Sequence, residues 1–237
     1  MRCMHEASMH EENMFLTLTY NDEHLPKNLS LNKKEIPLFL KKYRTYLERK
    51  EDGTKIRYFA CGEYGDNTNR PHYHALIFGH DFKDKEYHTR TEDGENLYTS
   101  HTLDRLWKLG YGIIGDVSFQ SAAYVARYQL KKITGLGASP HYGDRTPEFA
   151  LMSRGKDGGI GKPWLDKWAT DVYPNDYVIV NGKKMKPPKY YDAQLPEDFL
   201  KALKENRIEN SPEISDQQLH AKEVIAEQKQ KLIERMF

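Results

Sequence analysis

The stretch Arg70-Pro71-His72-Tyr73-His74-Ala75-Leu76-Ile77-Phe78 contains two histidines, two residues apart, followed by four apolar residues. Its aromatic and branched side chains favour a β-strand over residues 72–78. Side chains two residues apart in a strand point to the same face of the sheet, so His72 and His74 lie side by side. The residues between and after them, Tyr73, Ala75 and Ile77, take the opposite face and can be buried there.

The sequence on both sides of this stretch predicts an antiparallel arrangement. Further strands are expected over residues 15–20, 56–63 and 111–119. Apolar residues at helical spacing predict helices over residues 33–49, 102–108 and 121–133. The polar loop 65–69 joins two strands without an intervening helix, as in a hairpin. These elements predict an α+β fold, a mostly antiparallel sheet with helices on its face.

The remaining segments give weaker signals. Residues 80–96 form a charged insertion, and residues 135–163 are rich in glycine and proline and are expected to be a loop. A short helix is expected over 163–172, and Asn181-Gly182 predicts a hairpin over 177–184. From Pro196 the chain is charged and helical in composition. We therefore expect two parts, a domain over residues 1–195 and a helical tail over residues 196–237.

The composition excludes several classes of protein. The chain has 237 residues, of which 38% are hydrophobic and 30% charged, enough apolar material for a core. Its 36 basic and 35 acidic residues give a net charge of +1, so a DNA-binding surface has to be local. The sequence has no apolar run that predicts a signal peptide or a membrane span. Two cysteines, Cys3 and Cys61, make no disulfide framework, which favours a reducing cytoplasm.

A carboxylate is expected beside the two histidines. Glu63 ends the strand that precedes the hairpin loop, within cross-strand reach of His72 and His74. Two imidazoles and one carboxylate, with coordination positions left open, are typical of a catalytic metal site. The alternative is a pair of ordinary histidines on a half-exposed strand.

The helix expected over 121–133 carries a second candidate group. Tyr124, Tyr128 and Lys131 share one face of it, at positions i, i+4 and i+7. The apolar seam of this helix is expected on a nearly opposite face, at Ala122, Ala126, Leu130 and Ile133. The alternative is aromatic packing with Lys131 and Lys132 in solvent. A tyrosine hydroxyl can attack a phosphodiester that a metal ion polarises, and Lys131 and Arg127 can orient the phosphate.

Three segments resemble, in order, the motifs of HUH endonucleases, which initiate rolling-circle replication. They are Phe15–Tyr20, the triplet His72-Tyr73-His74, and Tyr124 with Tyr128 and Lys131. The surrounding residues resemble the replication initiators of gokushoviruses, small single-stranded DNA phages of the Microviridae. The stretches that carry this second resemblance are Tyr58-Phe-Ala-Cys-Gly-Glu-Tyr-Gly65, Arg70-Pro-His-Tyr-His74, Tyr124-Val-Ala-Arg-Tyr128 and Gly159-Ile-Gly161.

The resemblance covers residues 2–195 and implies a fold, a site and a function. The fold is an HUH or RRM-like sheet of about five antiparallel strands with flanking helices. Mg²⁺ or Mn²⁺ would bind Glu63, His72 and His74, and Tyr124 and Tyr128 would be the nucleophiles. The protein would nick the viral origin, form a 5′-phosphotyrosyl DNA, and circularise single-stranded genomes. Its partners would be viral DNA and the host helicase and polymerase, in the host bacterial cytoplasm. Family members usually have more chain before Arg2.

Two other functions remain open from the residues alone. A metal-dependent nuclease would use Glu63, His72 and His74 with water as the nucleophile and leave both tyrosines dispensable. A non-catalytic RRM-like module would bind nucleic acid by stacking bases on aromatic residues. A phosphate-loop reading of residues 155–162 fails, since Lys156 and Pro163 stand where the motif needs glycine and serine or threonine.

Three further features are less specific. Four lysines near the hairpin form either a DNA-backbone patch or a solvated surface; they are Lys183, Lys184, Lys186 and Lys189. The three tryptophans, Trp107, Trp164 and Trp168, are expected in the core. The remaining histidines receive no role.

Overall fold

A computed structural model describes residues 1–237 except 52, 66–67, 155–157, 181 and 236–237; the side chains of 128–131, 230 and 232–235 are also outside the description. The chain forms two compact units, Met1–Pro188 and Lys189–Phe237. The first contains the sheet, and the second contains α7 (Lys189–Asp192), α8 (Glu197–Glu209) and α9 (Asp216–Arg235). The predicted division at residue 195 stays a prediction.

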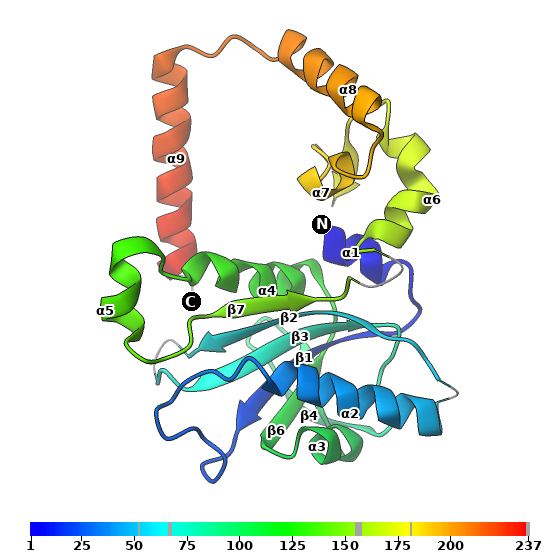
Figure 1. The fold of residues 1–237 in the computed structure, drawn as a ribbon, viewed down its shortest axis with the longest axis vertical. Helices are drawn as coiled ribbons and strands as arrows, with labels where there is room; N and C mark the ends of the chain where they lie inside the picture. Colours follow the sequence, from blue (N-terminus) through cyan, green and yellow to red (C-terminus); the bar gives the residue numbers. More distant parts are fainter. Residues whose placement is uncertain (52, 66–67, 155–157, 181, 236–237) are drawn as a thin grey trace. The chain divides into compact units, whose positions relative to one another are not determined.

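The first unit is built on one antiparallel sheet of seven strands, which confirms the α+β class (Figure 1). Their order across the sheet is β4-β5-β6-β1-β3-β2-β7. The bounds are β1 Asn13–Tyr20, β2 Arg57–Tyr64, β3 Pro71–Phe78, β4 Lys85–Arg90, β5 Asn96–Ser100, β6 Gly110–Gly115 and β7 Phe149–Met152. The predicted hairpin is β2 and β3, and β1 lies between β3 and β6.

Three strands were not predicted from the sequence. β4 and β5 form a hairpin that begins inside the charged segment 80–96 and extends past it. Their side chains are mostly exposed, so they lack the apolar alternation by which strands are predicted. β7 lies within the glycine- and proline-rich segment 135–163, which also contains η1 (Gly135–Gly137) and α5 (Ala138–Tyr142). Its four residues become a strand by pairing with β2, a tertiary effect that local sequence does not show.

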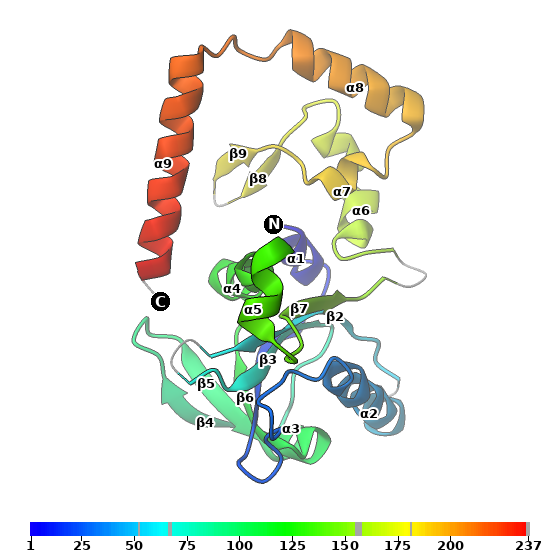
Figure 2. The ribbon, with the colours of Figure 1, turned by 60° about the vertical axis from the view of Figure 1, so that its left-hand side comes forward.

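Helices cover both faces of the sheet. Buried residues of α2 (Glu35–Lys50) and α3 (His101–Trp107) pack on one face, against the even-numbered residues of β1. On the other face, α4 (Phe119–Lys131) lies over β2, β3 and β7, and α1 (Arg2–Ala7) lies against β3 and α4 (Figures 1 and 2). β1 alternates between buried and half-buried side chains, as a strand with one fully covered face does.

The rest of the first unit follows the expectations with one correction. A helix, α6 (Lys162–Val172), and a hairpin, β8 (Val178–Val180) with β9 (Lys183–Met185), form where predicted. Trp107 is buried and Trp164 is half-buried against His5. Trp168 was wrongly expected in the core and is 38% exposed, because α6 buries Leu165 and Val172 instead.

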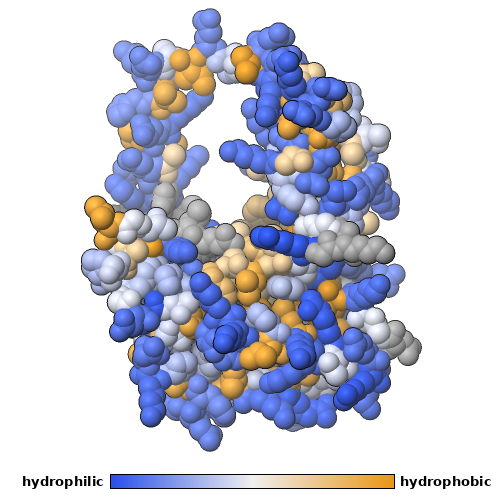
Figure 3. All heavy atoms as spheres, viewed as in Figure 1, coloured by the Kyte–Doolittle hydropathy of each residue, from blue (hydrophilic) through white to orange (hydrophobic). Residues whose placement is uncertain are grey.

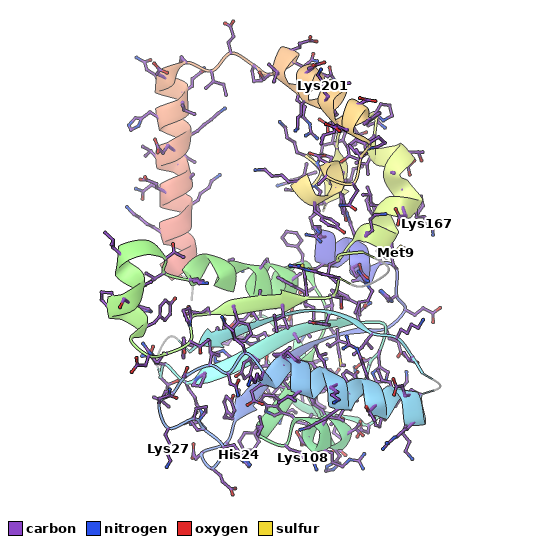
Figure 4. The ribbon with its side chains drawn as sticks, viewed as in Figure 1. Met9, His24, Lys27, Lys108, Lys167 and Lys201 are labelled. Atoms are coloured by element: carbon purple, nitrogen blue, oxygen red, sulfur yellow. The ribbon has the colours of Figure 1, made fainter. Side chains whose placement is uncertain are left out.

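The surface is predominantly polar. Figure 3 shows hydrophilic residues over most of the face that it presents, with apolar residues scattered among them. His24 and Lys27, from the loop after β1, lie at the same end of the unit as Lys108, which follows α3 (Figure 4). Among the described helices, none combines the length and apolar content needed to cross a bilayer.

Candidate active site

The register of two strands brings the three predicted metal ligands together. Glu63 of β2 pairs directly with His72 of β3, and residues 72 and 74 point to the same face. Glu63 and His74 are buried, whereas His72 is half-buried. The hairpin therefore presents a carboxylate and two imidazoles on the face of the sheet over which α4 lies.

Both imidazoles point at the same carboxylate oxygen. The distance from Glu63 Oε1 is 2.5 Å to His72 Nε2 and 3.0 Å to His74 Nε2. One ligand atom from each residue lies within 4.8 Å of the others. The second oxygen, Glu63 Oε2, is buried and has no hydrogen-bond partner among the described residues. The cluster thus contains an uncompensated buried acceptor, which a bound cation satisfies.

Hydrogen bonds behind the ring fix how each histidine faces the cluster. His72 Nδ1 lies 3.0 Å from the carbonyl oxygen of Arg70, and His74 Nδ1 lies 3.0 Å from the hydroxyl of Thr17. A carbonyl oxygen only accepts, so His72 Nδ1 carries a proton. In the neutral ring the Nε2 lone pair then faces Glu63, and two lone pairs at 2.5 Å require a cation or a second proton between them.

The protonation states favoured here are those of metal ligands. Burial alone raises the pKa of Glu63, but hydrogen bonds from His72 and His74 and their charges lower it below its ordinary value. Burial lowers the pKa of His74, and the neighbouring Glu63 opposes that shift only in part. An ionised carboxylate and a neutral imidazole are the forms that bind a metal.

These residues therefore fit a divalent cation. Imidazole suits first-row transition ions, while carboxylate and water suit Mg²⁺ and Mn²⁺. Two nitrogens and one oxygen favour Mn²⁺ over Mg²⁺, because Mg²⁺ prefers oxygen ligands. Three protein ligands leave coordination positions for a substrate oxygen and water.

Tyr124 of α4 lies at this cluster. Its hydroxyl donates a hydrogen bond to Glu63 Oε1 over 3.4 Å, and its ring meets that of His74 edge-on, with centroids 5.0 Å apart. Phe15 of β1 stacks on His74 at 5.3 Å and meets the Tyr124 ring edge-on at 6.3 Å. Tyr124 is half-buried, so α4 places one candidate nucleophile beside the three candidate ligands.

The other two predicted residues of α4 cannot be placed. The side chains of Tyr128 and Lys131 lie outside the described residues, although the helix backbone extends to residue 131. Helical geometry puts residue 128 one turn after Tyr124 on the same side of the helix.

The predicted apolar seam of α4 needs correction. Ala122 is buried as expected, but its partner in the core is Val125, and both pack on Phe59, Cys61 and other apolar residues of the sheet. Ala126 is exposed, and Ile133 lies beyond the end of the helix and is 37% exposed. The helix is rotated relative to the prediction because the 122/125 edge faces the sheet. Leu130 lies outside the described side chains.

Sequence reasoning missed the residues that support the centre. Thr17 and Phe15 lie in the predicted first strand, where only their β propensity was used. Both face His74 because Thr17 pairs directly with His74 across β1 and β3. The alternation of residues 15, 17 and 19 on one face is the signal that points to them once the strand order is known. That order is a tertiary property.

The fold and the site together define a class of protein: an α+β domain whose antiparallel sheet presents two histidines and a carboxylate beside a tyrosine of a covering helix. Residues 13–133 match the family of the replication-associated protein ORF2. The matched segment contains Glu63, His72, His74 and Tyr124. The chain belongs to this family.

Phage proteins are similar over most of the chain. The replication-associated protein VP4 of Bdellovibrio phage phiMH2K is 39% identical over 195 residues, which cover 80% of this chain and 60% of the phage protein. The replication-associated protein ORF2 of Spiroplasma virus 4 is 34% identical over 211 residues, or 83% of this chain and 63% of that protein. The chain thus spans about three fifths of the length of these relatives. No solved structure matches it.

Proposed function

We propose that this chain initiates rolling-circle replication of a phage genome by cutting one DNA strand at the origin with a tyrosine nucleophile. The observation that carries the proposal is the position of Tyr124, whose hydroxyl lies 3.4 Å from a carboxylate that also contacts His72 and His74. A nucleophile and a cation-binding cluster in contact are the two parts that phosphodiester cleavage requires.

The chemistry divides between the cluster and the helix. A Mn²⁺ or Mg²⁺ ion bound by Glu63, His72 and His74 supplies Lewis-acid polarisation of the phosphate. Glu63 accepts the hydrogen bond of Tyr124 and so directs the phenolic oxygen to the cluster. That oxygen bonds to phosphorus while the bond from phosphorus to the 3′ oxygen breaks. The phenol loses a proton and the leaving 3′ oxygen gains one, so the products are a 5′-phosphotyrosyl DNA and a free 3′ hydroxyl.

The second tyrosine serves the rejoining step in this proposal. The phosphotyrosyl bond retains the energy of the phosphodiester, so attack by a 3′ hydroxyl reverses the reaction without a nucleotide cofactor. Tyr128, one helical turn after Tyr124, would cut a second time while the first end is still held. Lys131 would bind phosphate on the same helix face. Together these steps release a circular, unit-length single-stranded genome.

The setting follows from the reaction. The substrate is the viral origin in the replicative form and the single-stranded genome. Unwinding and synthesis would come from a host helicase and polymerase in the host bacterial cytoplasm, as the resemblance of the sequence to gokushovirus initiators implies.

A covalent-trapping assay tests the proposal. Single-stranded DNA covering the cognate origin, labelled on the 3′ side of the nick, is incubated with protein and Mn²⁺ or Mg²⁺, and with chelator as the control. Denaturing gels compare wild type with Tyr124→Phe, Tyr128→Phe and the double variant. We expect a metal-dependent, slowly migrating adduct that the double variant does not form. Loss of the adduct in only one single variant would assign the first nucleophile.

The assay separates the alternatives. Cleaved DNA without an adduct in any lane would replace the proposal with a nuclease that uses water. Binding without cleavage, unchanged by chelator and by substitution of His72 and His74, would indicate a non-catalytic RRM-like module. Either result would overturn the tyrosine mechanism.

A further inference from the structure

One row of paired residues connects the candidate active site to an exposed aromatic side chain. Glu63 pairs with His72, His72 pairs with Thr19 of β1, and Thr19 pairs with Tyr111 of β6. Directly paired residues of antiparallel strands have their side chains on the same face. Tyr111 therefore stands on the face of the sheet that carries the cluster, two strands from His72, or about 10 Å.

This part of the face is open. The helices on this side, α1 and α4, lie over β2, β3 and β7. Beyond them, Thr17, Thr19 and Ile113 are half-buried, and Tyr111 is 66% exposed, whereas Ile114 on the opposite face is fully buried. A tyrosine this exposed contributes little to the core, so its ring is available to a ligand.

The strand beneath Tyr111 is held firmly. β6 lies between β1 and β5 in the sheet, and the Thr19 hydroxyl donates to the Tyr111 carbonyl over 3.4 Å. A Cβ at Gly110 would stand 2.2 Å from the Thr19 carbonyl oxygen, and one at Gly112 would stand 2.5 Å from Leu103. The backbone of β6 is thus packed tightly against β1 and α3, which fixes the base of the aromatic ring.

We infer that Tyr111 stacks against a base of single-stranded DNA that runs across this open strip from the scissile phosphate. The inference rests on the proposed function in that the cluster holds this phosphate. About 10 Å corresponds to roughly three base steps of a stacked strand, and to fewer in an extended one. An exposed ring flanked by threonine hydroxyls suits a base better than a protein helix, which needs a broader apolar surface.

The structure provides a matched control. Tyr87 of β4 is 63% exposed, close to the exposure of Tyr111. It pairs with Tyr98, which pairs with Ile114, so Tyr87 stands on the opposite face of the same sheet. Tyr87→Ala therefore removes an equally exposed tyrosine from a strand without touching the face of the cluster.

The test measures binding in chelator, so it does not depend on cleavage. Fluorescence anisotropy compares the affinity of wild type, Tyr111→Ala, Tyr111→Phe and Tyr87→Ala for a labelled single-stranded origin oligonucleotide. We expect Tyr111→Ala to weaken binding roughly 5- to 100-fold, as loss of one stacked base does, and Tyr111→Phe and Tyr87→Ala to bind within about 2-fold of wild type. Equal melting temperatures of the two alanine variants exclude a folding defect.

A second arm identifies the stacked nucleotide. Abasic sites are placed one at a time along the oligonucleotide, and each affinity is measured with wild type and with Tyr111→Ala. We expect one position where base removal weakens wild-type binding and has no further effect on Tyr111→Ala. Unchanged affinity of Tyr111→Ala, or an equal loss in Tyr87→Ala, would overturn the inference.

The result is separable from that of the trapping assay. An adduct together with normal binding by Tyr111→Ala would refute the stacking alone. Tyr111-dependent binding without an adduct would refute the tyrosine mechanism and leave the stacking site in place. Absence of DNA binding by the wild type would overturn both.

Discussion

At the scale of single residues, the candidate centre depends on groups that are not themselves ligands. His74 turns Nε2 to Glu63 because its other ring nitrogen is hydrogen-bonded to Thr17, and Phe15 stacks on the ring. His72 is oriented in the same way by a backbone carbonyl, which side-chain substitution does not remove. Thr17 is therefore the supporting contact that mutation can test.

Thr17→Val should weaken binding of Mn²⁺ about 10- to 100-fold, the usual effect of removing a hydrogen bond behind a metal-binding histidine. Valine keeps the shape and the strand propensity of threonine, so the fold should be retained. Isothermal titration with Mn²⁺ measures the change. The control is Thr19→Val, on the same strand and face, whose hydroxyl contacts the Tyr111 carbonyl instead of a histidine. Equal Mn²⁺ affinity of the two variants would show that Thr17 does not support the centre.

At the scale of elements, Glu6 fastens the short helix α1 to two distant segments. Its carboxylate is fully buried and accepts hydrogen bonds from Arg57 Nε of β2 at 2.5 Å and from the Gly161 amide at 2.6 Å. Gly161 precedes α6, and it belongs to the glycine-rich segment that fails as a phosphate loop. In the described part of that segment, a protein carboxylate binds the backbone amide.

Acid should remove this stabilisation. Burial raises the pKa of Glu6, but hydrogen bonds from His10, Gly161 and Arg57 lower it more, so its folded pKa lies below its ordinary value of 4.5. The stabilisation is complete above about pH 4.5 and is lost as the pH falls through the folded pKa. We expect Glu6→Gln to lower the free energy of unfolding by about 3 kcal/mol near neutral pH, because Arg57 loses its partner.

Urea unfolding from about pH 7 to about pH 3 measures this dependence. The difference between wild type and Glu6→Gln should shrink as the pH falls below about 4.5. Glu11→Gln, at an exposed position of the same segment, serves as the control and should unfold like wild type. A difference that stays constant with pH would contradict an ionised Glu6 as its source.

At the scale of the whole molecule, the described residues of the candidate centre lie within the unit Met1–Pro188. That unit also contains the seven-stranded sheet and both clusters of buried apolar residues that pack on its faces. The matched family segment, residues 13–133, lies inside the same unit. The second unit contributes none of these parts.

A fragment of residues 1–188 should therefore unfold cooperatively and bind Mn²⁺ within about 2-fold of the full chain, since the sheet and both cores are present. Circular dichroism during urea unfolding and titration with Mn²⁺ measure these two properties. A fragment of residues 1–195 tests the division expected from the sequence. Failure of the shorter fragment alone would move the boundary to that position.

The sequence by itself determined the local parts of this protein. Period-two patterns and branched residues predicted β1, β2, β3 and β6, and helical spacing predicted α2, α3 and α4, because local sterics and burial patterns set these elements. The same periodicity placed His72 and His74 on one face. The hairpin loop brought Glu63 opposite them, because an antiparallel pair joined by a short loop leaves few registers.

Tertiary structure decided everything that depends on strand order and on how helices settle on the sheet. β7 is a strand only because β2 offers it a partner, and α4 turned its 122/125 edge to the core, against the predicted seam. The contact between Tyr124 and Glu63 joins residues 61 positions apart, and the row from Glu63 to Tyr111 crosses four strands. Local propensities do not encode such contacts, because packing of the complete sheet selects them.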